Sequence, residues 1–276
     1  MENKRILITG GGGSLGTELV KQLAKKNSIY ILDSNETGFF NVVEEERLLG
    51  NNVDGRVGDI RKLETVESVF FEFQPEIVYH LAALKHVTPS EKNPREVIET
   101  NLIGLCNIVE ISKKYNVQKL VFTSSDKAVS RNIIYGLSKR LGELIVRNAG
   151  YVSVRFANLL GSQGSIIPLW EKAIKEGRPI MVTDERMERD FWTIEQACYL
   201  IIKATEIGKP GDIVILDAGQ NRINILELAK KIIAESGRDI PIRMIGMRPG
   251  EQLKEEMMTE EEQARAIKRD NFYIIS

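Results

Sequence analysis

The order of the apolar segments constrains the fold more strongly than any other feature of this sequence. Short β-branched runs alternate with helical patterns through the first half of the chain, beginning with KRILITG, SLGTELVKQLAKK, SIYILD and FFNVVEEERLLG. Nearly continuous apolar strands are typical of a parallel sheet that helices cover on both faces. The sequence therefore predicts an α/β fold built on a doubly wound parallel sheet.

A glycine-rich turn joins the first predicted strand to the first predicted helix. Gly10, Gly13 and Gly16 carry no side chains that would keep backbone N–H groups away from a pyrophosphate at the helix N-terminus. A P-loop would need Gly-Lys-Ser/Thr, whereas Thr17 and Glu18 follow the last glycine. The strand, turn and helix together predict a dinucleotide-binding Rossmann domain.

The ends of the next strands carry further candidate cofactor contacts. Asp33 follows Gly13 by twenty residues, where a carboxylate accepts hydrogen bonds from ribose hydroxyls and repels a 2′-phosphate, which favours NAD over NADP. A plain N-cap role for Asp33 or Ser34 is the alternative. Asp59 is expected near the adenine amino group, and His80, inside an apolar strand, is interpreted as a core histidine. Small side chains stand where the cofactor must pass, at Ala82 and Ala83.

A smaller region is expected beyond this repeating pattern. We assign residues 1–160 to the NAD(P)-binding domain and expect residues 191–220 to return to it. Residues 161–190 and 221–276 are expected to form a partly C-terminal substrate-binding region. The charge-dense stretch EEMMTEEEQARAIKRDNF is interpreted as a solvated helix.

The composition excludes several classes of function. The 39 acidic and 38 basic residues leave a formal net charge of −1, so no basic face for nucleic acid is expected. Cys106 and Cys198 lack metal or redox spacing, which indicates a reducing compartment and predicts no metal site. The sequence contains no signal-peptide core or membrane-length apolar run. We therefore predict a cytoplasmic protein, without membrane association, that acts on a small molecule.

A tyrosine and a lysine open one predicted helix directly after a strand that ends in serine. The pattern Tyr-x-x-x-Lys occurs three times in the sequence, but only Tyr135 and Lys139 have this context. Their side chains lie one helical turn apart on one face and can meet the serine hydroxyl. The lysine charge is expected to lower the pKa of the tyrosine, so that the phenol can act as a base.

Six segments in order, ILITGGGGSLG, LAALKHV, FTSSDKAV, YGLSK, RFANLLGSQGSIIP and RPGE, resemble the extended short-chain dehydrogenase/reductase superfamily. More narrowly, they are similar to the soluble, inverting UDP-N-acetylglucosamine 4,6-dehydratases of polysaccharide biosynthesis. The resemblance implies Ser125, Tyr135 and Lys139 as the oxidoreductase set. It implies Lys127 as the base that removes the C5 proton and Asp126 as the acid that protonates the leaving 6-hydroxyl. Lys127 must then be neutral for part of the cycle, which charge repulsion from nearby Lys139 and from the oxidised nicotinamide is expected to encourage.

The resemblance also implies a tightly bound NAD or NADP, a UDP-sugar substrate and a homo-oligomer. The remaining expected cofactor contacts are Ser14, Leu15, Ile60, Lys85 and Asn101. The expected substrate contacts are Lys85, Arg155, Asn158, Arg189, Arg248 and Glu251. Three alternatives stay open: a UDP-sugar 4-epimerase, which needs no Asp126–Lys127 pair, a dinucleotide-binding regulator without turnover, and a surface turn at Asp126–Lys127.

Overall fold

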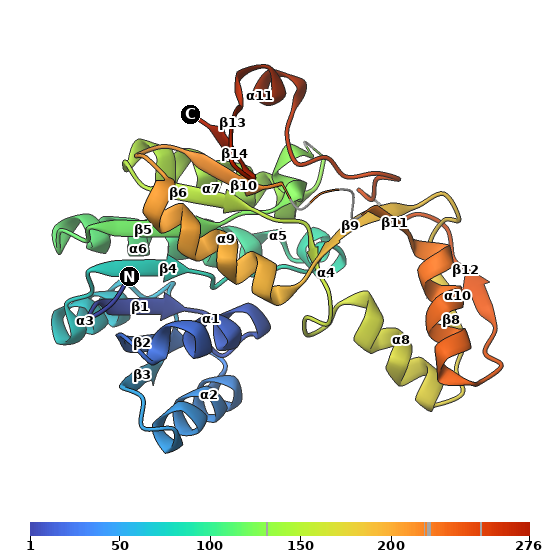
Figure 1. Cartoon of the computed structure of the whole chain (residues 1–276), viewed down its shortest axis with the longest axis horizontal. Helices are drawn as coiled ribbons and strands as arrows, with labels where there is room; N and C mark the ends of the chain where they lie inside the picture. The colour runs from blue at the N-terminus through green and yellow to red at the C-terminus, as the bar shows by residue number, and fades with distance from the viewer. Residues whose placement is uncertain (131, 218, 220–221, 249) are drawn as a thin grey trace.

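The computed structural model describes residues 1–130, 132–217, 219, 222–248 and 250–276. Figure 1 shows one large sheet with helices on both faces. In the described residues this sheet has nine strands in the order β13-β14-β10-β6-β5-β4-β1-β2-β3. The strands are β1 (Arg5–Thr9), β2 (Ser28–Asp33), β3 (Val53–Val57), β4 (Ile77–His80), β5 (Lys119–Thr123), β6 (Val152–Arg155), β10 (Ile213–Leu216), β13 (Ile267–Arg269) and β14 (Phe272–Ile275). All pair in parallel except β14 with β10 and β13 with β14. The predicted doubly wound sheet is confirmed.

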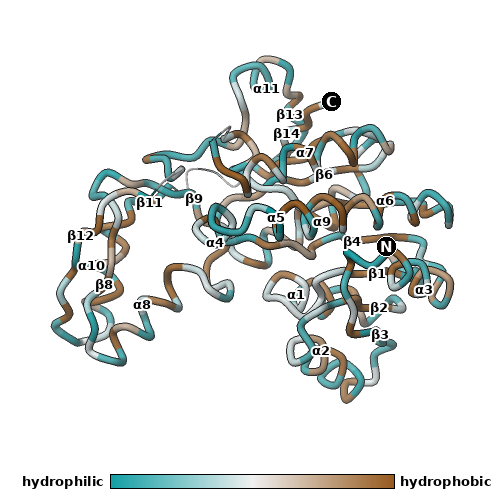
Figure 2. The backbone as a smooth tube through the Cα atoms, turned by 180° about the vertical axis from the view of Figure 1, so that it is seen from behind, coloured by the Kyte–Doolittle hydropathy of each residue, from teal (hydrophilic) through white to brown (hydrophobic). Residues whose placement is uncertain are grey.

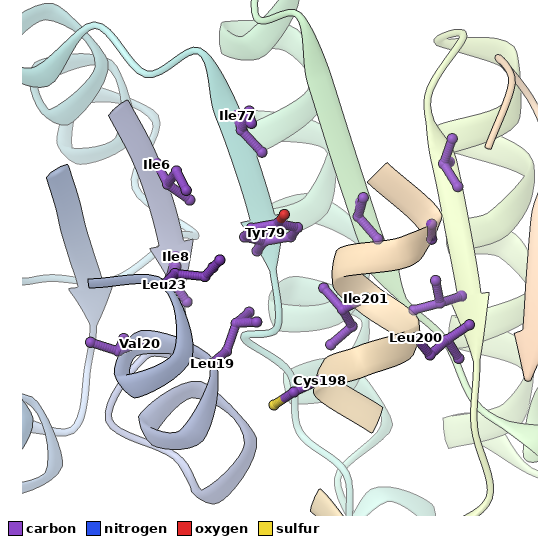
Figure 3. Close-up of a cluster of buried hydrophobic side chains, with 14 of the residues drawn as sticks. Ile6, Ile8, Leu19, Val20, Leu23, Ile77, Tyr79, Cys198, Leu200 and Ile201 are labelled. Carbon is purple, nitrogen blue, oxygen red and sulfur yellow. The ribbon is translucent and has the colours of Figure 1, made fainter. Parts of the chain in front are cut away.

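Alternation of side chains along β1, a buried interior strand of the sheet, explains the two helical layers. Ile6 and Ile8 of β1 point into one hydrophobic cluster, and Leu7 points into the other, because successive side chains of a strand face opposite sides. Figure 3 shows the first cluster, in which Leu19 of α1 and Ile201 of α9 pack near β1 and β4. The helices over this face are α1 (Ser14–Ala24), α2 (Glu36–Leu48) and α9 (Ile194–Ile207), and those over the other are α3 (Leu63–Phe73), α6 (Gly104–Lys114) and α7 (Ile134–Asn148).

A smaller lobe projects from one end of the sheet, as Figure 2 shows from behind. Its separate core includes Trp170, Ile180 and Ile225. The elements here are β7 (Asn158–Leu159), α8 (Ile166–Lys175), β8 (Ile180–Val182), β9 (Glu188–Trp192), β11 (Arg222–Asn224), α10 (Ile225–Ser236) and β12 (Ile242–Met244). Short helical segments connect the parts: α4 (Val87–Lys92), α5 (Pro94–Val97), the π-helix η1 (Ile98–Ile103), the 3-10 helix η2 (Asp126–Val129) and α11 (Glu260–Arg265).

The C-terminal segment departs from the sequence prediction. α9 packs on the large sheet and β10 pairs within it, and β13 and β14 also join this sheet, so residues 267–275 do not belong to the smaller lobe. The expected solvated helix is limited to α11, whose Glu262 is only 1% exposed. The charge density of this stretch gave no sign of the strand FYII, which is β14, lies between β10 and the edge strand β13, and buries Phe272, Ile274 and Ile275. None of the helices in the part of the chain that the structure describes has the length and apolar character that a membrane span requires.

Candidate active site

A cavity of about 630 Å³ opens at the carboxyl ends of the central strands. Strand order reverses there between β1 and β4, which is the usual ligand position in an open parallel sheet. Every predicted cofactor residue except Asn101 lines this cavity: Gly10, Gly13, Ser14, Leu15, Gly16, Asp33, Asp59, Ile60, Ala82, Ala83, Lys85, Tyr135 and Lys139.

The turn between β1 and α1 has no room for side chains. A Cβ atom at Gly16 would lie 2.3 Å from the carbonyl oxygen of Gly10, which itself has a φ of 75°. Gly13 is the N-cap residue before α1 and provides no side-chain hydrogen bond, and the first residues of the helix border the cavity. Uncapped N–H groups at a helix N-terminus are suited to pyrophosphate oxygens. The turn therefore fits the dinucleotide that the sequence predicts.

Asp33 is held at the cavity by backbone donors. One carboxylate oxygen accepts a hydrogen bond from the N–H of Gly12 at 2.8 Å, and the other accepts one from the N–H of Asn35 at 2.8 Å. Asn35, and not Asp33 or Ser34, caps α2 by accepting from the N–H of Gly38. The alternative N-cap interpretation is therefore wrong.

Two other predicted cofactor residues are engaged by neighbouring groups. Asp59 pairs with Arg61 at 2.6 Å, and the hydrogen bond from Arg61 holds the pKa of Asp59 below its usual value. Asn101 is buried, and its amide exchanges hydrogen bonds with the backbone of Leu84 and donates to Ser138. Asn101 therefore fixes the loop after β4 instead of lining the cavity, which corrects its predicted role.

His80 lies in the core, as expected. Its Nδ1 is 2.7 Å from the hydroxyl of Thr9, and its side chain is 1% exposed. Burial lowers the pKa of His80 to about 3, so the ring is neutral. Nε2 has no hydrogen-bond partner among the described residues.

Tyr135 and Lys139 lie on the first turns of α7 and both line the large cavity. The ammonium of Lys139 donates to the carbonyl of Thr123 at 2.8 Å and lies 6.0 Å from the centre of the Tyr135 ring. Burial lowers the pKa of Lys139 to about 7 and raises the pKa of Tyr135 to about 12. The expected lowering of the tyrosine pKa is therefore absent in this structure, because burial outweighs the surrounding charges.

The burial of Lys139 predicts that its replacement stabilises the protein. Lowering a lysine pKa from 10.5 to about 7 costs up to roughly 4 kcal/mol at pH 7. This free-energy cost to the folded state has its full size below pH 7. It disappears as the pH rises through 10.5, where Lys139 loses its proton in the unfolded chain as well. Thermal unfolding of cofactor-free Lys139→Met should therefore show a higher Tm at pH 7, with a gain that shrinks toward pH 10. An unchanged or lower Tm at pH 7 would contradict this expectation.

Asp126, which is buried, and Lys127, which is half-buried, belong to an ionic cluster and do not form an exposed surface turn. They begin η2 directly after β5, where the Ser125 hydroxyl caps the turn and donates to the Asp126 carboxylate at 2.6 Å. The Lys127 ammonium lies 3.2 Å from Asp126, 3.1 Å from Glu255 and 3.2 Å from the amide oxygen of Asn158. Asp126 is 3% exposed. Asp126, Lys127 and Glu255 border a second cavity of about 100 Å³.

The charges in this cluster oppose the expected neutrality of Lys127. Burial would lower the pKa of Lys127, but the carboxylates of Asp126 and Glu255 raise it above its ordinary value. Burial would also raise the pKa of Asp126, yet the charge of Lys127 and the hydrogen bond from Ser125 hold it below its usual value. Lys127 is therefore an ammonium in this structure, and its neutrality during part of the cycle stays a prediction.

Glu255 is the residue that sequence reasoning missed. It lies in the stretch interpreted as a solvated helix, but its carboxylate also accepts from Asn158 at 3.2 Å and lies 3.3 Å from Arg189. Burial, followed by the charge of Asp126, raises the pKa of Glu255. Its position four residues after the RPGE segment was the only available signal, because its partners are distant in sequence.

The predicted substrate contacts are divided among several environments. Arg155 is fully buried and pairs with Glu143 at 2.6 Å and Glu262 at 2.8 Å, so its prediction as a diphosphate contact is wrong. Arg189 is 9% exposed and faces Glu255. Lys85 lines the large cavity, Asn158 contacts Lys127, and Arg248 and Glu251 form an ion pair at 3.8 Å. Pro249 of the RPGE segment lies outside the described residues.

Comparison with known proteins shows which family and which structures this chain is similar to. The profile of the family described as "Polysaccharide biosynthesis protein" matches residues 6–276. CapD, a capsular polysaccharide biosynthesis protein of Staphylococcus aureus, is 37% identical over 95% of this chain and 46% of CapD, so the chain spans about half the length of that relative. A UDP-glucose 4-epimerase of Rickettsia bellii is 31% identical over 99% of this chain and 83% of the epimerase. The structure of Pen from Bacillus thuringiensis superposes with a TM-score of 0.93 at 35% identity, covering 99% of this chain and 88% of Pen.

The nine-stranded sheet, the glycine turn and the Tyr135–Lys139 pair define an extended short-chain dehydrogenase/reductase. Within that class, the chain belongs to the family described as "Polysaccharide biosynthesis protein".

Proposed function

We propose that this protein dehydrates UDP-N-acetylglucosamine to a 4-keto-6-deoxy sugar with inversion at C5. One observation carries the proposal: the ion pair of buried Asp126 with half-buried Lys127 follows, after two intervening residues, the end of β5, the strand that ends beside Tyr135 and Lys139. A Cβ atom at Gly136 would lie 2.2 Å from the Lys127 carbonyl, so the turn and α7 are in direct contact. Oxidation at C4 needs only Tyr135 and Lys139, whereas Asp126 and Lys127 supply the groups for elimination.

The large cavity supports a nicotinamide dinucleotide, with NAD favoured over NADP by the carboxylate of Asp33. When bound, this cofactor supplies reversible acceptance of a hydride from the sugar. Tyr135 takes the proton of the 4-hydroxyl, and Lys139 and Ser125 orient the phenol and the sugar. The 4-ketone then acidifies the C5–H bond, so that Lys127 can remove this proton while Asp126 protonates the departing 6-hydroxyl.

A UDP-sugar 4-epimerase is the second candidate, and the named Rickettsia relative favours it. An epimerase uses Tyr135 and Lys139 but has no chemical need for a half-buried Lys127 between two carboxylates. A regulator that binds a dinucleotide without turnover would need neither pair. The expected homo-oligomer stays a prediction, supported by exposed Leu137, Leu141 and Leu144 on α7.

One incubation distinguishes the candidates. The protein is mixed with UDP-N-acetylglucosamine in heavy water without added reductant, and the product is analysed by mass spectrometry and proton NMR. We expect loss of one water and deuterium at C5. A product of unchanged mass with inverted C4 would establish the epimerase instead. No conversion of any UDP-sugar by protein that contains cofactor would favour the regulator.

A further inference from the structure

Glu255 reaches the cluster from a distant part of the chain. It contacts Lys127 at 3.1 Å across a separation of 128 residues and Asn158 at 3.2 Å across 97 residues. The segment that carries it is anchored two residues later, where Arg155 donates to the carbonyl of Met257 at 3.0 Å. Since Arg155 is fully buried, this anchor is part of the core. Glu255 is therefore held at the reactive turn by the fold and not by local sequence.

To act as the base at C5, Lys127 must first transfer a proton from its ammonium group to another side chain. Lys127 is an ammonium between two carboxylates, and an ammonium removes no proton from carbon. Elimination also needs an acid, while Asp126 accepts hydrogen bonds from Ser125 and from Lys127, as an ionised carboxylate does. A second carboxyl group that both receives the lysine proton and later returns it would meet both needs.

We propose that Glu255 is the proton-exchange partner of the Asp126–Lys127 pair during dehydration, an inference that rests on the proposed function. Glu255 first takes a proton from the Lys127 ammonium, which leaves a neutral amine and a carboxylic acid. The amine then removes the C5 proton, and the C5–H electron pair enters the enolate. As the enolate expels the C6 oxygen with the bonding pair, the Glu255 proton passes through Asp126 to that oxygen and forms water. Lys127 is again an ammonium and Glu255 a carboxylate, so the protons balance.

The charged surroundings of Glu255 are consistent with this role. Asp126 and Lys127 face it from η2, Arg189 from β9 and the hydroxyl end of Tyr135 from α7. Burial and the nearby charge of Asp126 raise the pKa of Glu255, whereas the pKa of Asp126 is lowered, so Glu255 is the better proton store of the two. Glu255 acts through Lys127 and Asp126, and is therefore a positioning residue that also exchanges a proton.

Glu255→Gln tests this role because glutamine keeps the shape and the hydrogen bonds but carries no charge and stores no proton. With lysines labelled with ¹³C at Cε in the full chain, the Lys127 resonance is identified by its absence in Lys127→Met. We expect Lys127 in Glu255→Gln to titrate at least one pH unit lower than in the wild type. We also expect the rate of water loss to fall by at least roughly 100-fold. Glu255→Asp, which keeps the carboxylate, should recover at least about tenfold over the glutamine variant.

Glu256→Gln is the matched control, because the Glu256 carboxylate pairs with Arg222 at 3.2 Å instead of Lys127. In Glu256→Gln, the titration of Lys127 and the rate of water loss should match those of the wild type. An unshifted Lys127 titration in folded Glu255→Gln, or a rate within threefold of the wild type, would overturn the proposal. If the wild type dehydrates no UDP-sugar, the proposed function fails, and the titration of Lys127, which needs no turnover, still decides whether Glu255 controls its protonation.

Discussion

Arg155→Met is expected to lower the free energy of unfolding by about 3–5 kcal/mol at pH 7, because it leaves buried carboxylates without their partner. Arg155 is fully buried and forms charged hydrogen bonds to both oxygens of Glu143 and of Glu262. It also donates to the carbonyl of Met257 and so anchors the segment that carries Glu255. Methionine fills a similar volume but makes none of these bonds. Urea unfolding followed by circular dichroism measures the loss.

The pH dependence of this loss gives an independent check. Burial alone would raise the pKa of Glu262, but the hydrogen bond and charge of Arg155 lower it to about 2. The wild type therefore gains stability from Glu262 above its ordinary pKa of 4.5 and loses that gain as the pH falls toward 2. The difference between Arg155→Met and the wild type should be largest at pH 7 and should narrow below pH 4.5.

Arg140→Met is the control for the buried arginine. Arg140 touches the same two carboxylates, at 3.2 Å from Glu143 and 2.5 Å from Glu262, but its side chain is 36% exposed. Solvent screens such a pair, so we expect a loss of less than about 1 kcal/mol. A loss for Arg155→Met as small as that of the control, or one that does not change with pH, would refute the account of the buried cluster.

Lys127→Met is expected to reduce the rate of water loss by about 10²–10⁴-fold, the usual contribution of a general base. The side chain lies between Asp126 and Glu255 and outside the lining of the large cavity, so the amount of bound cofactor should not change. Product formation from UDP-N-acetylglucosamine by mass spectrometry, together with the cofactor content of the purified variant, measures both expectations. Retained dehydration would remove Lys127 as the base.

Lys127→Arg separates the charge of the lysine from its basicity. Arginine keeps the positive charge between the two carboxylates, but its guanidinium does not lose a proton in proteins. A base role therefore predicts that this variant is as inactive as Lys127→Met, whereas a purely electrostatic role predicts substantial activity. Lys254→Met serves as a surface control, since this lysine is 56% exposed and pairs with Glu188. The rate of water loss by Lys254→Met should equal that of the wild type.

The sequence alone determined the local features of this protein. The alternation of Ile6, Leu7 and Ile8 is enough to bury a strand between two helical layers, because side chains of a strand point to opposite faces. Gly10 and Gly16 could be assigned to a tight turn because only glycine tolerates the close backbone approach found there. The position of Lys139 one turn after Tyr135 follows from helical spacing, and both residues line the large cavity.

Only the tertiary structure decided the partners and protonation of the buried charges. Arg155 resembles a substrate arginine in sequence, but Glu262, 107 residues away, binds it in the core. Glu255 resembles a solvated charge, but the fold places it against Lys127. The sequence predicted that a second lysine helps Lys127 to be neutral for part of the cycle, whereas the structure places two carboxylates beside it. The physical reason is that electrostatic energies depend on distance and burial, which long-range contacts establish and sequence spacing does not contain.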